Sequence, residues 1–399
     1  MRVLPRIAWR LMRETNLRLL ALFLRQCAWG GLRAVHAFTH RVARGEFFPA
    51  FVFISVTNAC SLRCQGCWVT QTKPPVELPV ETVSALIEAC SRRHSRFFGI
   101  MGGEPLLYRG LFDLLARHRD CYFQLFTNGM MLTDEVAGRF RALGNVTPLV
   151  SIEGLGRTSD ERRGGTNVYG RALEGLAACR RQGLITGVAS SVCASNIAEV
   201  ASEAFVRDMI GRGVQYLWYY IYRPVGASPS PQLALTDEQV RALRRFILDA
   251  RARMPMLIVD AYWDDRGRAV CPAAMGISHH VNPWGDIEPC PPLQFAAEKA
   301  GNGNDFGTAV TRSAFLGATR ALMTATSRGC ILLEHPAELA AHLERSGARD
   351  TSGRGTGLAE LRSLPQCASH HQPGCELPER TFFYRFAKKH WFFGFGAYG

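Results

Sequence analysis

The sequence lacks a hydrophobic run long enough to cross a membrane. Its clearest candidate, residues 19–24, holds six apolar residues between Arg18 and Arg25, whereas a transmembrane helix needs about 20. The same segment lacks the small-residue cleavage site of a signal peptide. Internal repeats and long low-complexity tracts are also missing, and 47% hydrophobic with 20% charged residues is a globular composition. We therefore expect a folded protein in the reducing cytoplasm.

Acidic residues are scarce at both ends of the chain. Residues 1–45 hold nine arginines and a single acid, Glu14, and residues 380–399 hold four cations and no acid. These ends account for +12 of the formal net charge of +13, so the body is close to neutral. Aromatic and basic side chains can bind nucleic acid, but a neutral body offers no basic track to continue such a surface. Nucleic acid is therefore disfavoured as a partner.

The two ends also share an amphipathic composition. Residues 1–48 are predicted to form basic amphipathic helices, and residues 376–399 an aromatic and basic tail. The aromatic residues of 380–399 are Phe382, Phe383, Tyr384, Phe386, Trp391, Phe392, Phe393, Phe395 and Tyr398. Aromatic side chains beside Lys and Arg are typical of segments that lie at a membrane interface. We expect peripheral association with the inner face of the membrane, with packing of the ends against the body as the alternative.

Between residues 49 and 265, strand and helix patterns alternate. The first strand pattern is FVFISV at 51–56, and about six strand-plus-helix units follow in unbroken order. Such alternation predicts parallel strands joined by right-handed crossovers. Six units are too few for a closed barrel of eight. The predicted fold is therefore α/β, a partial (β/α)6 barrel of the TIM type, followed by a cysteine-rich extension over 266–375.

The first cysteine cluster follows the first predicted strand directly. The odd number of 13 cysteines, the chain length and the clustering argue against a disulfide-stapled domain. Cys60, Cys64 and Cys67 form a Cys-x3-Cys-x2-Cys loop at the strand end where barrel active sites are built. Three thiolates can bind three irons of a 4Fe-4S cluster and leave the fourth iron open. Structural zinc is the alternative, but it needs a nearby fourth ligand, and the next histidine is His94.

This loop resembles the cluster-binding motif of the radical S-adenosylmethionine (SAM) superfamily, and further elements match in order over roughly residues 50–225. The segment MGGEP at 101–105 resembles the family's GGEP motif, which implies that Gly102, Gly103 and Glu104 bind the SAM amino group. Later segments of the chain also resemble family segments, and one polar residue lies at a predicted strand end. These observations nominate five further SAM-binding residues: Asn128, Ser151, Glu153, Arg163 and Ser190. In one departure, Gly66 precedes the third cysteine, where many members have an aromatic residue, and Trp68 follows it.

The resemblance implies radical chemistry. Electrons from a reductant such as a flavodoxin or ferredoxin would reduce the cluster, which would cleave SAM to a 5′-deoxyadenosyl radical. The radical would abstract hydrogen from an unactivated C–H bond. The membrane-like ends favour a lipid or polyprenoid substrate, and the alternative is peptide or protein modification. An Fe–S electron carrier or sensor without catalysis is the alternative of another class, which the GGEP motif disfavours.

A second cysteine set lies in the extension. Cys271, Gly285 and Cys290 have the spacing that resembles the opening of a SPASM/twitch extension, with the intervening residues as a hairpin turning at WGD. This resemblance implies one auxiliary Fe–S cluster, bound by Cys271 and Cys290 with two of Cys330, Cys367 and Cys375. Plain buried thiols are the alternative. The remaining cysteines lie in apolar contexts and are predicted to be core: Cys27, Cys90, Cys121, Cys179 and Cys193.

Overall fold

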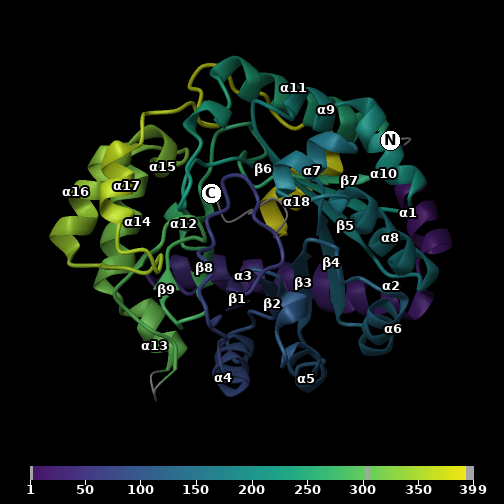
Figure 1. Cartoon of the computed structure of the whole chain (residues 1–399), viewed down its shortest axis with the longest axis horizontal. Helices are drawn as coiled ribbons and strands as arrows, with labels where there is room; N and C mark the ends of the chain where they lie inside the picture. The colour runs from purple at the N-terminus through teal and green to yellow at the C-terminus, as the bar shows by residue number, and fades with distance from the viewer. Residues whose placement is uncertain (1–2, 302–304, 392–399) are drawn as a thin grey trace.

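Nine strands form one curved sheet at the centre of the molecule (Figure 1). The computed structural model describes residues 3–301 and 305–391, so Phe392, Phe393, Phe395 and Tyr398 of the predicted tail lie outside the described residues. The strands are β1 (Phe51–Thr57), β2 (Phe97–Gly102), β3 (Tyr122–Thr127), β4 (Val146–Ser151), β5 (Gly187–Val192), β6 (Tyr216–Ile221), β7 (Leu257–Val259), β8 (Ser278–Val281) and β9 (Ile287–Glu288). Their order is β7-β6-β5-β4-β3-β2-β1-β8-β9.

The predicted partial barrel is confirmed, and it is larger than expected. Strands β1 to β7 are parallel and follow one another in chain order, so a seventh strand completes the series. Strand β8 pairs in parallel with the other side of β1, and β9 returns antiparallel as the predicted hairpin. The sheet therefore continues across the predicted domain boundary between residues 265 and 266.

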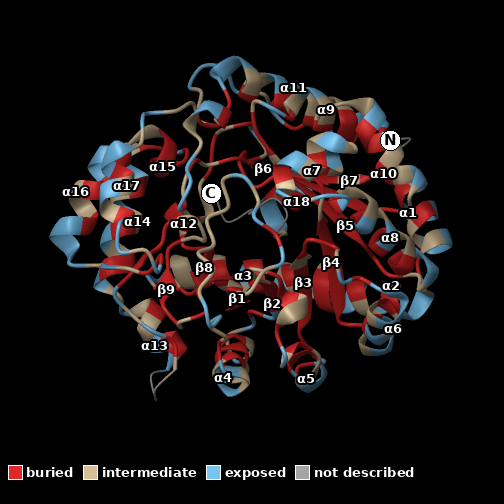
Figure 2. Ribbon diagram, in the orientation of Figure 1, coloured by how far each residue is buried: buried red, intermediate tan, exposed pale blue. Residues whose placement is uncertain are grey.

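Helices cover the outer face of the sheet. Those of the barrel are α4 (Val80–Ser91), α5 (Leu111–Arg117), α6 (Asp134–Leu143), α7 (Arg157–Arg163), α8 (Val168–Arg181), α9 (Ile197–Val200), α10 (Glu203–Gly211) and α11 (Asp237–Arg253). Figure 2 shows their buried sides turned to the strands and their exposed sides outward. None of the described helices combines the length and the apolar composition that crossing a bilayer requires.

The extension forms a second helical layer beside β8 and β9. Its helices are α12 (Pro272–Met275), α13 (Phe306–Thr311), α14 (Ala314–Thr326), α15 (Ile331–Glu334), α16 (Pro336–Ser346) and α17 (Gly357–Ser363). A short ladder of β10 (Phe295–Ala296) and β11 (Arg349–Asp350) joins its two halves. The extension thus lies next to β1, the strand that carries the first cysteine loop.

Aromatic side chains fill the inside of the barrel. Along β1, Val52 and Ile54 pack toward the outer helices, whereas Phe53 faces inward, as the two-residue period of a strand requires. Phe53 contacts Phe126 with ring centroids 5.9 Å apart. On β2, a Cβ atom at Gly99 would lie 2.4 Å from the Phe53 ring, so only glycine leaves room for it. The barrel interior is therefore a packed core below the strand ends.

The N-terminal residues form a strap beneath the barrel. It comprises α1 (Val3–Glu14), α2 (Leu17–Phe23), the π-helix η1 (Leu24–Trp29) and α3 (Gly30–Val42). Its polar side chains donate to backbone carbonyls in the turns before successive strands. These contacts are Arg10 to Pro255 at 2.6 Å and to Val214 at 3.0 Å, Arg18 to Ala142 at 3.4 Å, Gln26 to Arg119 at 2.6 Å and Arg41 to Arg93 at 2.9 Å. Because these turns follow helices whose last carbonyls lack partners, the strap satisfies them and closes the barrel floor.

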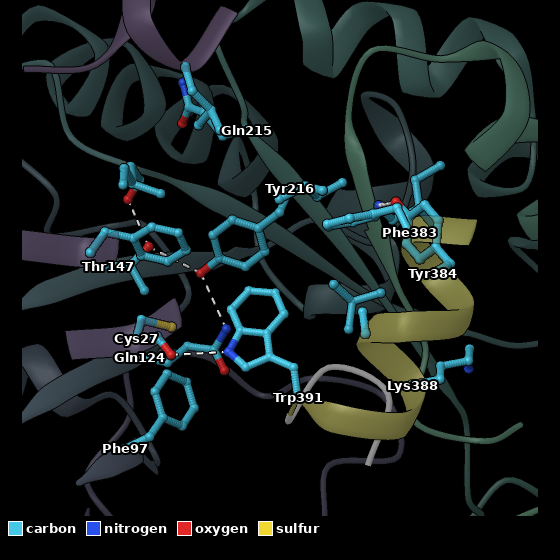
Figure 3. Close-up of a pocket in the computed structure, with 17 residues that line it drawn as sticks. Cys27, Phe97, Gln124, Thr147, Gln215, Tyr216, Phe383, Tyr384, Lys388 and Trp391 are labelled. Carbon is cyan, nitrogen blue, oxygen red and sulfur yellow. Dashed lines mark hydrogen bonds between the residues drawn. The ribbon is translucent and has the colours of Figure 1, made fainter. Parts of the chain in front are cut away.

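The C-terminal helix α18 (Phe382–His390) packs on the same floor (Figure 3). Tyr384 Oη accepts a hydrogen bond from the backbone nitrogen of Ile258 at 3.0 Å. Trp391 Nε1 donates to the carbonyl oxygen of Cys27 at 3.0 Å, which ties the end of the chain to the strap. A narrow apolar cavity remains between helix and barrel. The packing alternative predicted for the two ends is thus confirmed for their described residues.

Five buried charged side chains anchor this helix. Asp260, which follows β7, pairs with Lys388 at 2.9 Å and Arg251 at 2.6 Å, and Glu379 pairs with Arg244 at 2.9 Å. Burial opposes ionisation of Asp260, but its three cationic neighbours hold the pKa of that carboxyl well below its usual range. Because three cations face two carboxylates, removing a carboxylate leaves more uncompensated buried charge.

Candidate functional site

The first cysteine loop lies at the carboxyl end of β1, as predicted. Cys60, Cys64 and Cys67 are partly exposed there. The buried side chain of Asn58 fixes both ends of the loop, because its Nδ2 donates to Thr70 O at 3.1 Å and its Oδ1 accepts from Val76 N at 2.7 Å. Sequence reasoning missed Asn58, although an Asx residue directly before such a loop is a recognisable turn signal.

The thiols of this loop share one counter-ion. Burial raises the pKa of Cys67 to about 11 and also raises the pKa of Cys60. Burial alone would lower the pKa of Arg163, but the neighbouring Cys64, Glu153 and Cys67 raise it. Arg163 is therefore a permanent cation beside three potential thiolates. Such a cation favours the ionised form that metal binding requires.

Helix α7 brings Arg163 to the loop. The nitrogen of Gln65 donates to Arg162 O at 2.9 Å, and a Cβ atom at Gly164, where φ is +65°, would lie 2.0 Å from Arg63 O. The guanidinium of Arg163 lies 3.6 Å from Glu153, and its Nε is buried without a hydrogen-bond partner. The structure thus brings together two predicted site residues, Glu153 and Arg163, with the cysteines.

The GGEP segment packs directly on the start of the loop. Gly102 has φ of +138°, and a Cβ atom there would lie 2.2 Å from Thr57 O. At Gly103 a Cβ atom would lie 2.1 Å from Ala59 O. Both glycines are therefore required for the close approach of two backbones, which is an observed reason for the motif.

Glu104 is fully buried next to Asn128. Its Oε2 accepts from Asn128 N at 2.7 Å, and its Oε1 accepts from Thr127 Oγ1 at 2.8 Å and Leu106 N at 3.2 Å. Burial raises the pKa of Glu104, and the three hydrogen bonds act in the opposite direction. The Nδ2 of Asn128 is buried and unpartnered. An unused donor beside a buried carboxylate fits a bound polar group, since buried polar atoms are normally paired.

The two predicted serines have different surroundings. Ser190 is buried, and its hydroxyl donates to Ile152 O at 2.6 Å. The hydroxyl hydrogen of Ser190 is therefore already bonded within the protein. Ser151 ends β4 and is only partly buried. Glu153, two residues later, accepts from Ser191 N at 2.8 Å. A SAM-binding role for Ser151 and Ser190 stays a prediction.

An aromatic ring from another strand occupies the space beside Gly66. Gly66 has φ of +68°, and a Cβ atom there would lie 2.2 Å from the hydroxyl of Tyr222, which follows β6. Trp68 lies on the other side of the loop, with its ring 5.3 Å from that of His280 on β8. Sequence reasoning missed Tyr222 because the two residues are far apart in the chain and no local pattern connects them.

Three cysteines of the extension converge on Arg223. Burial raises the pKa of Cys271 to about 11 and also raises the pKa of Cys290, and the nearby thiol of Cys330 raises the pKa of both further. Arg223 Nε donates to Cys330 Sγ at 3.0 Å. This residue is the immediate neighbour of Tyr222, so the end of β6 contacts both cysteine sets.

The two remaining candidates are placed differently. The backbone nitrogen of Cys367 donates to Leu333 O at 2.8 Å, which places Cys367 against α15, the helix that begins after Cys330. Cys375 is exposed and lies near Arg241, with Sγ 3.8 Å from Nη1. The five cysteines predicted as core are all buried.

Among residues 3–301 and 305–391, no three His, Cys, Asp or Glu side chains converge tightly enough to hold a single metal ion. A cubane cluster binds each thiolate at a different iron. The donor set of Cys60, Cys64 and Cys67, with Arg163 beside it, fits a 4Fe-4S cluster with one open iron. The orphaned Asn128 amide and the glycine cradle fit SAM.

Comparison with known proteins agrees with this site. Residues 54–195 match the model of the Radical SAM superfamily. Pre-heme d1 synthase of Dinoroseobacter shibae is 29% identical over 47% of each chain. The maturation protein SkfB of Bacillus subtilis is 27% identical over 39% of each chain. The PqqA peptide cyclase of Streptomyces rochei is 27% identical over 61% of this chain and 69% of its own. For the first two, the match spans less than half of the relative's length.

Solved structures show the same fold. SuiB of Streptococcus suis bound to SAM superimposes with a TM-score of 0.61 at 15% identity, over 74% of this chain and 72% of that chain. SuiB bound to the precursor peptide SuiA gives 0.60 at 14% identity, over 71% and 69%. With the cysteine loop, the GGEP cradle and the partial barrel in place, the family match shows that residues 54–195 of this chain are a Radical SAM domain.

Proposed function

We propose that this protein is a radical SAM enzyme that modifies a peptide or protein substrate at an unactivated C–H bond. Cys60, Cys64 and Cys67 would bind a 4Fe-4S cluster, and the open iron would bind SAM. When bound and reduced, this pair supplies the 5′-deoxyadenosyl radical. The observation that carries the proposal is the junction of the cysteine loop, the GGEP cradle and Arg163 at one end of the barrel.

The protein residues bind and orient these groups. Gly102 and Gly103 let a ligand approach the backbone closely, and Asn128 offers an unpartnered amide. The carboxylate of Glu104 is fixed by its hydrogen bonds to Thr127 and to the backbone, so it is preorganised for the SAM amino group. Arg163 compensates the negative charge of the thiolates.

The peptide substrate is supported by the relatives. SkfB is a maturation protein, the Streptomyces relative is a peptide cyclase, and SuiB was solved with a precursor peptide. The predicted lipid or polyprenoid substrate has no such support, and the peptide alternative fits better. Tetrapyrrole chemistry, suggested by the pre-heme d1 synthase likeness, is the second candidate.

The architecture fits a long substrate that enters from one side. The strap and α18 close the barrel floor, so a substrate reaches the site from the carboxyl ends of the strands. The extension lies beside β1 at that end. We propose that it binds one auxiliary Fe–S cluster through Cys271, Cys290, Cys330 and Cys367, and that Cys375 is not a ligand.

The test is an anaerobic assay with reconstituted full-length protein, SAM, dithionite and peptides encoded next to the gene. We expect a peptide that stimulates 5′-deoxyadenosine formation and emerges with the mass change of lost hydrogen or a new bond. Stimulation by a porphyrinoid and by none of the peptides would overturn the peptide assignment. The Cys64→Ala variant is the control, since it should form no product.

A further inference from the structure

The exposed apolar side chains of this protein gather on its two terminal segments. In the described part of the chain, nine large apolar side chains are exposed, and eight of them belong to the strap or to α18. We define the basal surface by these eight residues: Leu4, Trp9, Met12, Leu17, Leu24, Trp29, Phe382 and Phe386. The most exposed are Phe382 at 76% and Leu17 at 68%. Large exposed apolar side chains that gather on neighbouring segments, unlike singly scattered ones, mark a contact surface.

The two segments lie together under the barrel. Figure 1 shows α3 and α18 next to each other behind the strands, and Trp391 bonds to Cys27 in η1. The inward sides of the strap are occupied, because Arg10, Gln26 and Arg41 bind the turns of the floor. The outward sides have no such contacts to account for their apolar residues.

The charge of the basal surface has one sign. Five exposed arginines there make no ion pair with any carboxylate among the described residues: Arg6, Arg13, Arg25, Arg33 and Arg385. The strap's acid Glu14 is engaged by Arg10 at 2.8 Å. Arg13 lies over the ring of Trp9 at 5.0 Å, so cation and aromatic ring are presented together. The surface is therefore apolar, aromatic and positively charged at once.

We infer that the basal surface docks the protein on a bilayer that contains anionic lipid. Trp and Phe side chains are favoured at the headgroup level of a membrane, and arginines are attracted by anionic headgroups. Two weak anchors at opposite ends of the chain are needed for stable docking, and the fold brings both to one side. The site opening would then face away from the bilayer, because the strap covers the opposite ends of the strands.

The inference goes beyond the proposed chemistry, and vesicle binding tests it separately. The full-length protein is floated with phosphatidylcholine vesicles that contain or lack phosphatidylglycerol. We expect binding only with the anionic lipid, and weaker binding as salt is raised. The variant W9S/W29S should lose binding. In R6Q/R25Q/R33Q the affinity should fall roughly five-fold per charge removed.

Two matched controls test the position of the surface. Met131→Ser removes a large exposed apolar residue that lies outside the basal surface, and Arg171→Gln removes an exposed arginine of α8. Both should bind vesicles as the wild type does, and thermal unfolding monitors that all variants fold. Equal binding to neutral and anionic vesicles, or no effect of the basal substitutions, would overturn the inference. It is also wrong if light scattering shows a dimer that W9S/W29S converts to a monomer, since a second copy would then cover the surface.

Discussion

The Nε–H group of Arg223 donates a hydrogen bond to the Sγ atom of Cys330 at 3.0 Å. Its neighbour Tyr222 packs against Gly66 of the other cysteine loop. Two adjacent residues at the end of β6 therefore contact both candidate cluster sites. The end of this one barrel strand therefore fixes the position of the two sites relative to each other.

Replacing Arg223 should weaken the auxiliary site. In Arg223→Gln the buried thiolates lose their cation and a hydrogen-bond donor, so we expect iron to fall from about eight toward about four atoms per chain. Any auxiliary cluster that remains should show a more negative midpoint potential, because the reduced state carries more negative charge. Iron analysis and a redox titration followed by electron paramagnetic resonance measure both. Arg241→Gln, beside Cys375, is the matched control; equal iron and potential in both variants would contradict the account.

The fourth ligand of the auxiliary site can be decided between two cysteines. Cys367 lies against α15, whereas Cys375 is exposed near Arg241. We expect Cys367→Ser to lower the iron content and Cys375→Ser to leave it unchanged. Iron loss in Cys375→Ser with none in Cys367→Ser would show that the assignment is wrong.

Glu104 should matter for SAM and not for iron. Glu104→Gln removes the charge while keeping the shape, so SAM affinity should fall by about 10- to 100-fold, the range for hydrogen bonds to a charged group. The iron content should stay at the wild-type level. Equilibrium dialysis with labelled SAM measures the affinity. Ser95→Ala serves as control, since this serine precedes β2 at the opposite end of the barrel, its hydroxyl bonds to Pro49 O, and we expect little change in affinity; equal losses in both variants would argue against the placement.

Gly66 should tolerate no side chain. At φ of +68° an alanine is strained, and its Cβ would overlap the hydroxyl of Tyr222. Gly66→Ala should therefore reduce iron bound by the first loop and destabilise the fold by about 1–3 kcal/mol. Gly138→Ala, on an open face of α6, should instead stabilise it by about 0.5–1 kcal/mol. Denaturant unfolding compares them, and a neutral Gly66→Ala would mean that the Tyr222 contact is wrong.

The loss of stability caused by a substitution in the buried charge cluster under the barrel should depend on the sign of the charge that is removed. Asp260→Asn leaves three cations facing one anion, so we expect a loss of about 3–5 kcal/mol of unfolding free energy. Lys388→Met leaves two cations and two anions and should cost less. Because its cations hold the pKa of Asp260 below the ordinary 3.8, its contribution is complete above about pH 4 and is lost only in stronger acid. Unfolding curves across pH test this, and equal costs for the two variants would contradict the charge balance.

The local features of the site were predictable from the sequence. Cys60, Cys64 and Cys67, the glycines of GGEP and the strand that precedes each motif are short-range patterns, and the partial barrel follows from their alternation. The contacts that complete the site were not predictable. Tyr222 meets Gly66, and Arg223 meets Cys330, across long stretches of chain, and no periodicity encodes such pairs.

The two terminal segments show what amino-acid composition alone cannot predict. Their composition predicts a membrane-facing role for the arginines, yet Arg10, Arg18 and Arg41 donate hydrogen bonds to carbonyl groups of the barrel floor. Composition does not distinguish a cation that caps a helix from one that faces a lipid, since both lie on an amphipathic helix. The two kinds of cation differ in their contacts and burial, which only the fold determines.

Reductive cleavage of SAM is the decisive test of radical SAM activity in this protein. The anaerobically reconstituted protein is mixed with SAM and dithionite, and 5′-deoxyadenosine is quantified against the Cys60→Ala, Cys64→Ala and Cys67→Ala variants. We predict 5′-deoxyadenosine from the wild type and none above background from the three variants. Equal yields from wild type and variants, or none from a wild type that carries its full iron content, would contradict this prediction.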